Sequence, residues 1–142
     1  MSYATQAMLV KRFGERQLVQ LTDRGEVPTG QIDTDLVAQE LANTDAVING
    51  YVGNRYRLPL DPTPDLVTDL AISIALYKLH AFAPDPKVKD DYEHAIRTLR
   101  DISSGTVKLD AAGVEPASSG ASGVQFIDRE RPLTPESMRG FI

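Results

Sequence analysis

The sequence predicts an all-α protein: a small helical bundle of about four to five helices, followed by an extended, flexible C-terminal tail. Three observations lead to this prediction. Apolar residues recur every three or four positions through long stretches, which is the spacing of one helix face. Capping residues, and the glycines or prolines that end helices, bound those stretches. From residue 110 onward the composition changes abruptly, and alanine, glycine and serine replace the periodic pattern.

The first two elements are expected to be short helices. Thr5 is placed to cap a helix over residues 5–13, which Gly14 ends. A second helix follows over residues 15–21, where its leucines fall on one face. Residues 24–31 contain two glycines and a proline, so they are expected to form a loop.

Residues 34–56 are expected to form the longest helix, with Asp33 as its cap. One face is marked at steps of four, three, four, three and four residues by Val37, Leu41, Thr44, Ile48, Tyr51 and Arg55. Asn49-Gly50 is also a strong hairpin signal. The preceding residues lack the alternation that a strand requires, so we predict a helix through this pair.

Two further helices complete the expected core. Prolines at positions 59, 62 and 64 predict a stiff connector before the next helix. Thr63 is expected to cap that helix, with Pro64 at its first position, and the helix runs to about Phe82. Its buried stripe is expected to be Leu66, Leu70, Ile74 and Tyr77. The last helix is capped by Asp85 and ended by Gly105. Its inner face carries Val88, Tyr92, Ile96, Leu99 and Ile102. Both helices should pack against the helix over residues 34–56.

Composition excludes several classes of protein. The chain has 142 residues, of which 42% are apolar, which suits one domain with an appendage. It has no cysteine, so disulfides and thiolate zinc sites are excluded. The most apolar window, residues 71–77, is far shorter than the ~20 residues of a membrane span, and the polar N-terminus does not resemble a signal peptide. The net charge of −5 argues against a sequence-independent grip on DNA.

No residue pattern predicts an active site, a cofactor or a metal. The two histidines, His80 and His94, lie on different expected helices and neither has a second histidine four residues away. The carboxylates at positions 61, 65 and 69, and the pair at 90 and 91, lack the glycine turn and the alternating ligands of a calcium loop. Nucleophile-elbow and phosphate-loop motifs are also missing, so we expect a protein that is not an enzyme.

The chain is expected to divide into a helical domain, residues 1–109, and a linker with a docking tail, residues 110–142. Residues 111–123 have the composition of a flexible linker. Apolar residues reappear after it, and apolar residues beyond a polar linker suggest a docking site. The expected anchors of a partner interface are Phe126, Leu133, Met138, Arg139 and Phe141. Arg55 and Tyr56, basic and aromatic, are a second choice.

The order of several short blocks carries a resemblance to a known family. The blocks are Y-V-G-N-R-Y-R-L-P-L at 51–60, Y-A-T at 3–5, R-F-G-E-R-Q-L-V-Q-L-T-D at 12–23, Y-E-H-A-I-R-T-L-R-D-I-S-S-G at 92–105 and, more weakly, S-M-R-G-F at 137–141. In this respect the chain resembles a family of small head-completion or head-to-tail connector proteins from Mu-like phages and prophages. Where that pattern is commonly acidic early in the first helix, this chain has Met8.

The resemblance implies a structural virion protein that acts at the portal vertex of a tailed phage or prophage. Its expected partners are itself as a ring, the portal, and neck or tail-completion proteins. DNA would pass through without specific binding, and no membrane is involved. The expected locations are the virion and, during assembly, the host cytoplasm. The alternative is a nucleic-acid-binding regulator in which residues 5–13 and 15–21 form a helix-turn-helix, although Arg16 is the only basic residue on the second helix.

Overall fold

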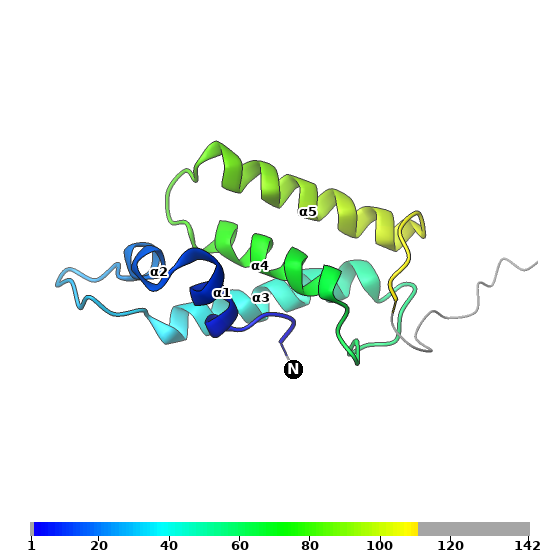
Figure 1. Ribbon diagram of the computed structural model, residues 1–142, viewed down its shortest axis with the longest axis horizontal. Coiled ribbons are helices and arrows are strands. Elements are labelled where there is room, and N and C mark those ends of the chain that lie inside the picture. The colour runs from blue at the N-terminus through cyan, green and yellow to red at the C-terminus, as the bar shows by residue number, and fades with distance from the viewer. Residues whose placement is uncertain (1, 111–142) are drawn as a thin grey trace, which may run out of the picture.

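The protein is described by a computed structural model over residues 2–110, and these residues form a helical bundle that contains no strand (Figure 1). The helices are α1 (Gln6–Phe13), α2 (Glu15–Thr22), α3 (Thr34–Val52), α4 (Asp65–Leu79) and α5 (Pro86–Ser104). The prediction of an all-α bundle is therefore confirmed. The predicted linker and docking tail lie, from residue 111 on, outside the described residues.

The centre of the bundle is α4. It runs antiparallel to α3 and α5 and contacts both, and α1 packs against α3 and α4 (Figure 1). No charged residue occurs in α4 between Asp69 and Lys78, so nearly the whole circumference of this helix can be buried. The buried side chains of α4 are Val67, Leu70, Ala71, Ile72, Ile74, Ala75, Leu76 and Leu79. Burial on several sides explains why three other helices can be arranged around it.

The single buried stripe predicted for α4 was partly wrong. Leu70 and Ile74 are buried, but Leu66 is 38% exposed and Val67 takes its place in the core. Tyr77 is half-buried, and its ring stacks on that of Tyr92 in α5 with the centroids 3.9 Å apart. A helix that is covered on several sides has no single apolar face, so the spacing of its apolar residues does not identify the buried ones.

Two predicted helix ends were too late. The helix α3 passes through Asn49-Gly50 as predicted but ends at Val52, four residues before Tyr56. Gly53 and Asn54, which follow, are poor helix formers. The helix α4 begins at Asp65, after Pro64 instead of Thr63, and ends at Leu79, short of the predicted Phe82.

Histidine His80 explains the early end of α4. Its Nδ1 lies 2.7 Å from the carbonyl oxygen of Leu76, the acceptor that the next helical turn would use. Its backbone N–H instead donates to the carbonyl oxygen of Tyr77 at 3.2 Å. Pro84 also disfavours the helical conformation at Ala83. The helix therefore ends at Leu79, three residues before Phe82.

The remaining helix boundaries agree with the sequence. Thr5 caps α1 by accepting a hydrogen bond from the N–H of Met8 at 3.4 Å. The Asp33 carboxylate caps α3 by accepting from two backbone N–H groups, each at 3.1 Å. Gly14 separates α1 from α2 with a φ of 90°, and Gly105 ends α5 with a φ of 85°. These positive angles explain why glycine is suited to both positions.

The N-terminal segment is held against α3. The backbone N–H of Tyr3 donates to Asp45 Oδ1 at 3.0 Å, and the Tyr3 hydroxyl donates to Asn49 Oδ1. Burial of this hydroxyl raises the pKa of Tyr3 above its usual value. The aromatic ring of Tyr3 is thus part of the core, although Tyr3 precedes the first helix.

A pair of leucines in α4 tests the assignment of the core. Replacing Leu70, which is 4% exposed, by alanine is expected to lower the free energy of unfolding by about 2–5 kcal/mol, because the change leaves a cavity. Leu66→Ala, one turn earlier and 38% exposed, is the matched control and should change it by less than about 1 kcal/mol. Urea denaturation followed by circular dichroism measures both. Equal losses would contradict the assignment.

Candidate functional site

The described residues contain neither a metal-binding cluster nor a membrane-spanning helix. No group of three or more His, Cys, Asp or Glu side chains between residues 2 and 110 is arranged to hold a metal ion. In the same range, no helix has both the length and the apolar character that a membrane crossing requires. Asp69 forms an ion pair with Arg12. Asp91 lies 2.8 Å from the ammonium of Lys87. These carboxylates therefore belong to surface ion pairs.

The block around Arg55 and Tyr56 holds the chain that follows α5. Tyr56 is 3% exposed, and its hydroxyl accepts a hydrogen bond from the backbone N–H of Leu109 at 2.9 Å. The connector between α3 and α4 is thereby joined to a residue 53 positions later in the chain. The side chain of Leu109 is itself buried. Residue 109 is thus fixed to the body, immediately before the predicted linker.

Arg55 makes a second contact with the same part of the chain. Its guanidinium lies so close to Gly105 that a Cβ built on this glycine would be 2.6 Å from the Arg55 Cζ. A side chain at position 105 would therefore collide with Arg55, in addition to the strain of a positive φ. We call the two contacts, Arg55 with Gly105 and Tyr56 with Leu109, the exit clamp.

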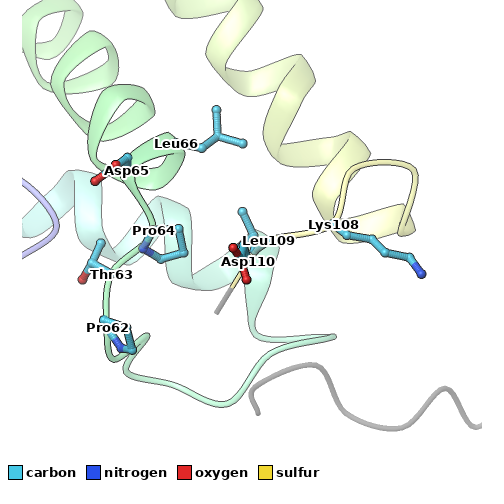
Figure 2. A pocket seen from close by; sticks show the side chains of 8 residues that line it. All are labelled: Pro62, Thr63, Pro64, Asp65, Leu66, Lys108, Leu109 and Asp110. Carbon is cyan, nitrogen blue, oxygen red and sulfur yellow. The ribbon is translucent and has the colours of Figure 1, made fainter. Parts of the chain in front are cut away.

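A groove lies beside the exit clamp. It has a volume of about 460 Å³ and is lined by residues 62–66 and residues 108–110. Figure 2 shows the connector and the start of α4 on one side of it, and the segment that follows α5 on the other. The side chain of Lys108 extends away from the groove. We call this the connector groove. The described chain ends at its edge, at Asp110.

A second groove lies at the opposite end of the bundle. The loop between α2 and α3 and the loop between α4 and α5 lie at this end (Figure 1). The groove has a volume of about 370 Å³ and is lined by Gln20, Leu21, Asp23, Arg24, His80, Ala81, Phe82 and Ala83. We call it the loop groove. Phe82 is 89% exposed, the most exposed large apolar side chain among residues 2–110.

Hydrogen bonds hold the walls of the loop groove in place. The guanidinium of Arg24 donates to the carbonyl oxygen of Leu21 at 3.0 Å and also to that of Leu79, so it ties α2 to the end of α4. The carboxylate of Asp23 accepts from the N–H groups of Thr29 and Gly30, each at 3.0 Å. These bonds lower the pKa of Asp23 below its usual value because they stabilise the charged form.

Comparison with known proteins identifies the family. The model of the family described as "Bacteriophage Mu, Gp36" matches residues 3–127. The chain belongs to the Gp36 family. This chain is similar to gene product J of Escherichia phage Mu, with 28% identity over 142 residues that cover the whole of both chains. The Mu-like prophage FluMu protein gp36 of Haemophilus influenzae is 26% identical over 140 residues, which cover 99% of this chain and 98% of that protein. The expected relation to Mu-like phages and prophages is confirmed.

The anchors predicted for a partner interface of this Gp36-family chain are not part of the described structure. Phe126, Leu133, Met138, Arg139 and Phe141 all lie outside residues 2–110. The second predicted interface pair, Arg55 and Tyr56, contacts the chain after α5 instead, and Tyr56 is buried. A role for these residues at a partner interface stays a prediction.

The helix-turn-helix alternative receives no support from the geometry of α1 and α2. That motif joins its two helices by a turn of about three or four residues. Here Gly14 alone separates α1 from α2. The inner residues of α2, Leu18 and Thr22, are buried in the body. The geometry of α1 and α2 therefore does not favour a helix-turn-helix.

Sequence reasoning missed both grooves of this Gp36-family protein. The connector groove depends on the contact between residues 56 and 109, which no local pattern indicates. The loop groove had one visible signal, namely a phenylalanine, Phe82, placed just before Ala83-Pro84. The sequence predicts a helix through Phe82, and this prediction hides the exposed position of the residue after the true end of α4.

The hydrogen bond of the exit clamp can be removed by Tyr56→Phe. This change leaves the buried N–H of Leu109 without its acceptor and should lower the free energy of unfolding by about 1–3 kcal/mol. Amide hydrogen exchange should become faster at Leu109. Tyr77→Phe, which removes the hydroxyl but keeps the ring stacked on Tyr92, is the control and should leave that exchange rate unchanged. Unaltered exchange in the Tyr56 variant would exclude the clamp in solution.

Two glycine-to-alanine changes should have opposite signs. Gly105→Ala should destabilise the protein by at least about 1–2 kcal/mol, because of its positive φ and the collision with Arg55. Gly50→Ala is made inside α3, where nothing lies within 4 Å of the new Cβ, and should stabilise by about 0.5–1 kcal/mol. Thermal or urea unfolding measures both. Stabilisation by Gly105→Ala would contradict the geometry described at the end of α5.

Proposed function

We propose that this protein is a non-enzymatic structural subunit of the phage particle, which forms a ring at the portal vertex and connects the head to the tail. The observation that carries this proposal is the family match over residues 3–127, with relatives in phage Mu and a Mu-like prophage. Its neighbours are the portal and the neck or tail-completion proteins. Its locations are the host cytoplasm during assembly and then the virion.

The geometry of the exit clamp supports an architecture of a body with a docking tail. The exit clamp holds Leu109 to the body, so the residues that follow start from a defined point. The composition of residues 111–123 is that of a linker, and Phe126, Leu133, Met138 and Phe141 come after it. A tethered apolar segment strengthens assembly, because the tether raises its effective concentration near a partner.

A ring also fits the two unlike ends of the bundle. Each subunit of a ring contacts its two neighbours through two different surfaces, and repetition of this contact closes the ring. The loop groove is lined in part by the α4–α5 connection and the connector groove by the α3–α4 connection. These two connections lie at opposite ends of the bundle (Figure 1). The net charge of −5 suits a channel through which DNA slides without being held.

Removal of the tail tests the proposal. A variant that lacks residues 124–142 should keep its helical circular dichroism, because the core lies within residues 2–110. It should lose assembly onto the portal, because the docking segment is gone. The assay is complementation of a Mu-like prophage whose own copy of the gene is inactivated. Electron microscopy of the lysate should then show heads and tails that are not joined.

A scrambled tail provides the matched control. It keeps the length and composition of residues 124–142 but not their order, so it separates docking by specific anchors from a general effect of added chain. It should fail as the truncated variant does, whereas the unaltered chain should restore joined particles. Joined particles with the truncated variant would reject the tail as the docking element.

A further inference from the structure

We propose that the loop groove receives the C-terminal segment, residues 124–142, of a second copy of this chain. This inference rests on the proposed ring and names the partner of its tail. The C-terminal segment would leave one subunit at its exit clamp and bind in the loop groove of the next subunit. Such a contact is heterologous, and it closes when the subunits are arranged in a ring.

The loop groove has the properties of a site for an apolar segment. Phe82 projects at its edge with 89% exposure, and Leu21, Ala81 and Ala83 supply apolar lining. Exposed apolar surface rimmed by polar groups is typical of interaction sites. The Arg24 bonds to the carbonyls of Leu21 and Leu79 hold the groove in shape without an occupant. An occupant would therefore bind to a surface that is already formed.

The C-terminal segment has matching chemistry. Its apolar residues are Val124, Phe126, Ile127, Leu133, Met138, Phe141 and Ile142. It also carries three acidic and three basic residues, so these charges cancel. The segment is therefore not repelled by the net negative charge of a second chain. The groove presents one side chain of each sign, Asp23 and Arg24. Apolar burial is thus expected to dominate the contact.

The reach of the linker favours a second copy over the chain's own groove. Residues 80–83 of the loop groove precede α5, and residues 105 and 109 of the exit clamp follow it. The 19 residues of α5, which span ~28 Å, therefore separate the two sites. A linker with the composition and length of residues 111–123 has a root-mean-square span of ~18–22 Å. It would have to be stretched to return along its own body. The loop end of a head-to-tail neighbour would instead face the exit end directly.

The absence of cysteine allows a direct test by disulfide cross-linking. One variant carries Ala81→Cys in the loop groove, and the other carries Ser137→Cys in the tail, each with a different affinity tag. The two proteins are mixed, oxidised and separated on a denaturing gel. The expected product is a disulfide between the two tagged chains. Ala42→Cys, at an exposed alanine of α3 outside the groove, replaces Ala81→Cys as the control and should give none.

A second pair of variants tests the role of Phe82. Adding Phe82→Ser to the Ala81→Cys protein should abolish the mixed disulfide, because the exposed ring is part of the contact. Adding Val27→Ser should leave the yield unchanged. Val27 is also apolar and 77% exposed in the α2–α3 loop, but it does not line the groove. Equal yields with both changes would overturn the assignment of the groove.

The same cross-link is sought in phage particles from cells that express both cysteine variants. A mixed disulfide in solution or in particles supports the inference. Its absence from both overturns it, and so does a disulfide within one chain as the main product of the Ala81→Cys/Ser137→Cys double variant. If the protein is present in particles without any cross-link, only this inference fails. If the protein is absent from particles, the proposed function fails.

Discussion

The burial of α4 on several sides is the constraint on which the rest of the structure depends. Leu70, Ile74 and Leu79 contact a core to which α1, α3 and α5 all contribute, and burial of each such side chain stabilises the fold by about 1.5–3 kcal/mol. A central helix whose neighbours in the chain run antiparallel to it places the connections before and after it at opposite ends of the bundle. One end therefore carries the loop groove, and the other carries the connector and the point where the chain leaves.

Local signals predicted those parts of the fold that local chemistry decides. Asp33, Thr5 and Gly105 bound helices because their side chains, or the lack of one, satisfy or permit a particular backbone geometry. The end of α4 was predicted too late because the decisive group, the ring of His80, acts on a carbonyl one turn earlier. Leu66 was misplaced because periodicity indicates a face and not what covers it.

The candidate sites were less accessible to sequence reasoning. Arg55 and Tyr56 stood out by composition and order, but their contacts are with residues 105 and 109, about 50 positions away. Pairings of that separation follow from how helices pack and not from any short pattern. Phe82 is a similar case. Its exposure follows from the early end of α4, and the groove beside it is formed with α2; neither is visible in the residues around Phe82.

The exit clamp also determines how mechanical tension would enter this protein. A pull on the C-terminal chain would first meet the Tyr56–Leu109 hydrogen bond and the buried side chain of Leu109. The load would then pass into the connector after α3 before it reached the last turn of α5. Peeling α5 away from its end, one turn at a time, would thus be opposed by the body. A chain held in this way can bear a pull on its C-terminal end without the last turn of α5 unravelling first.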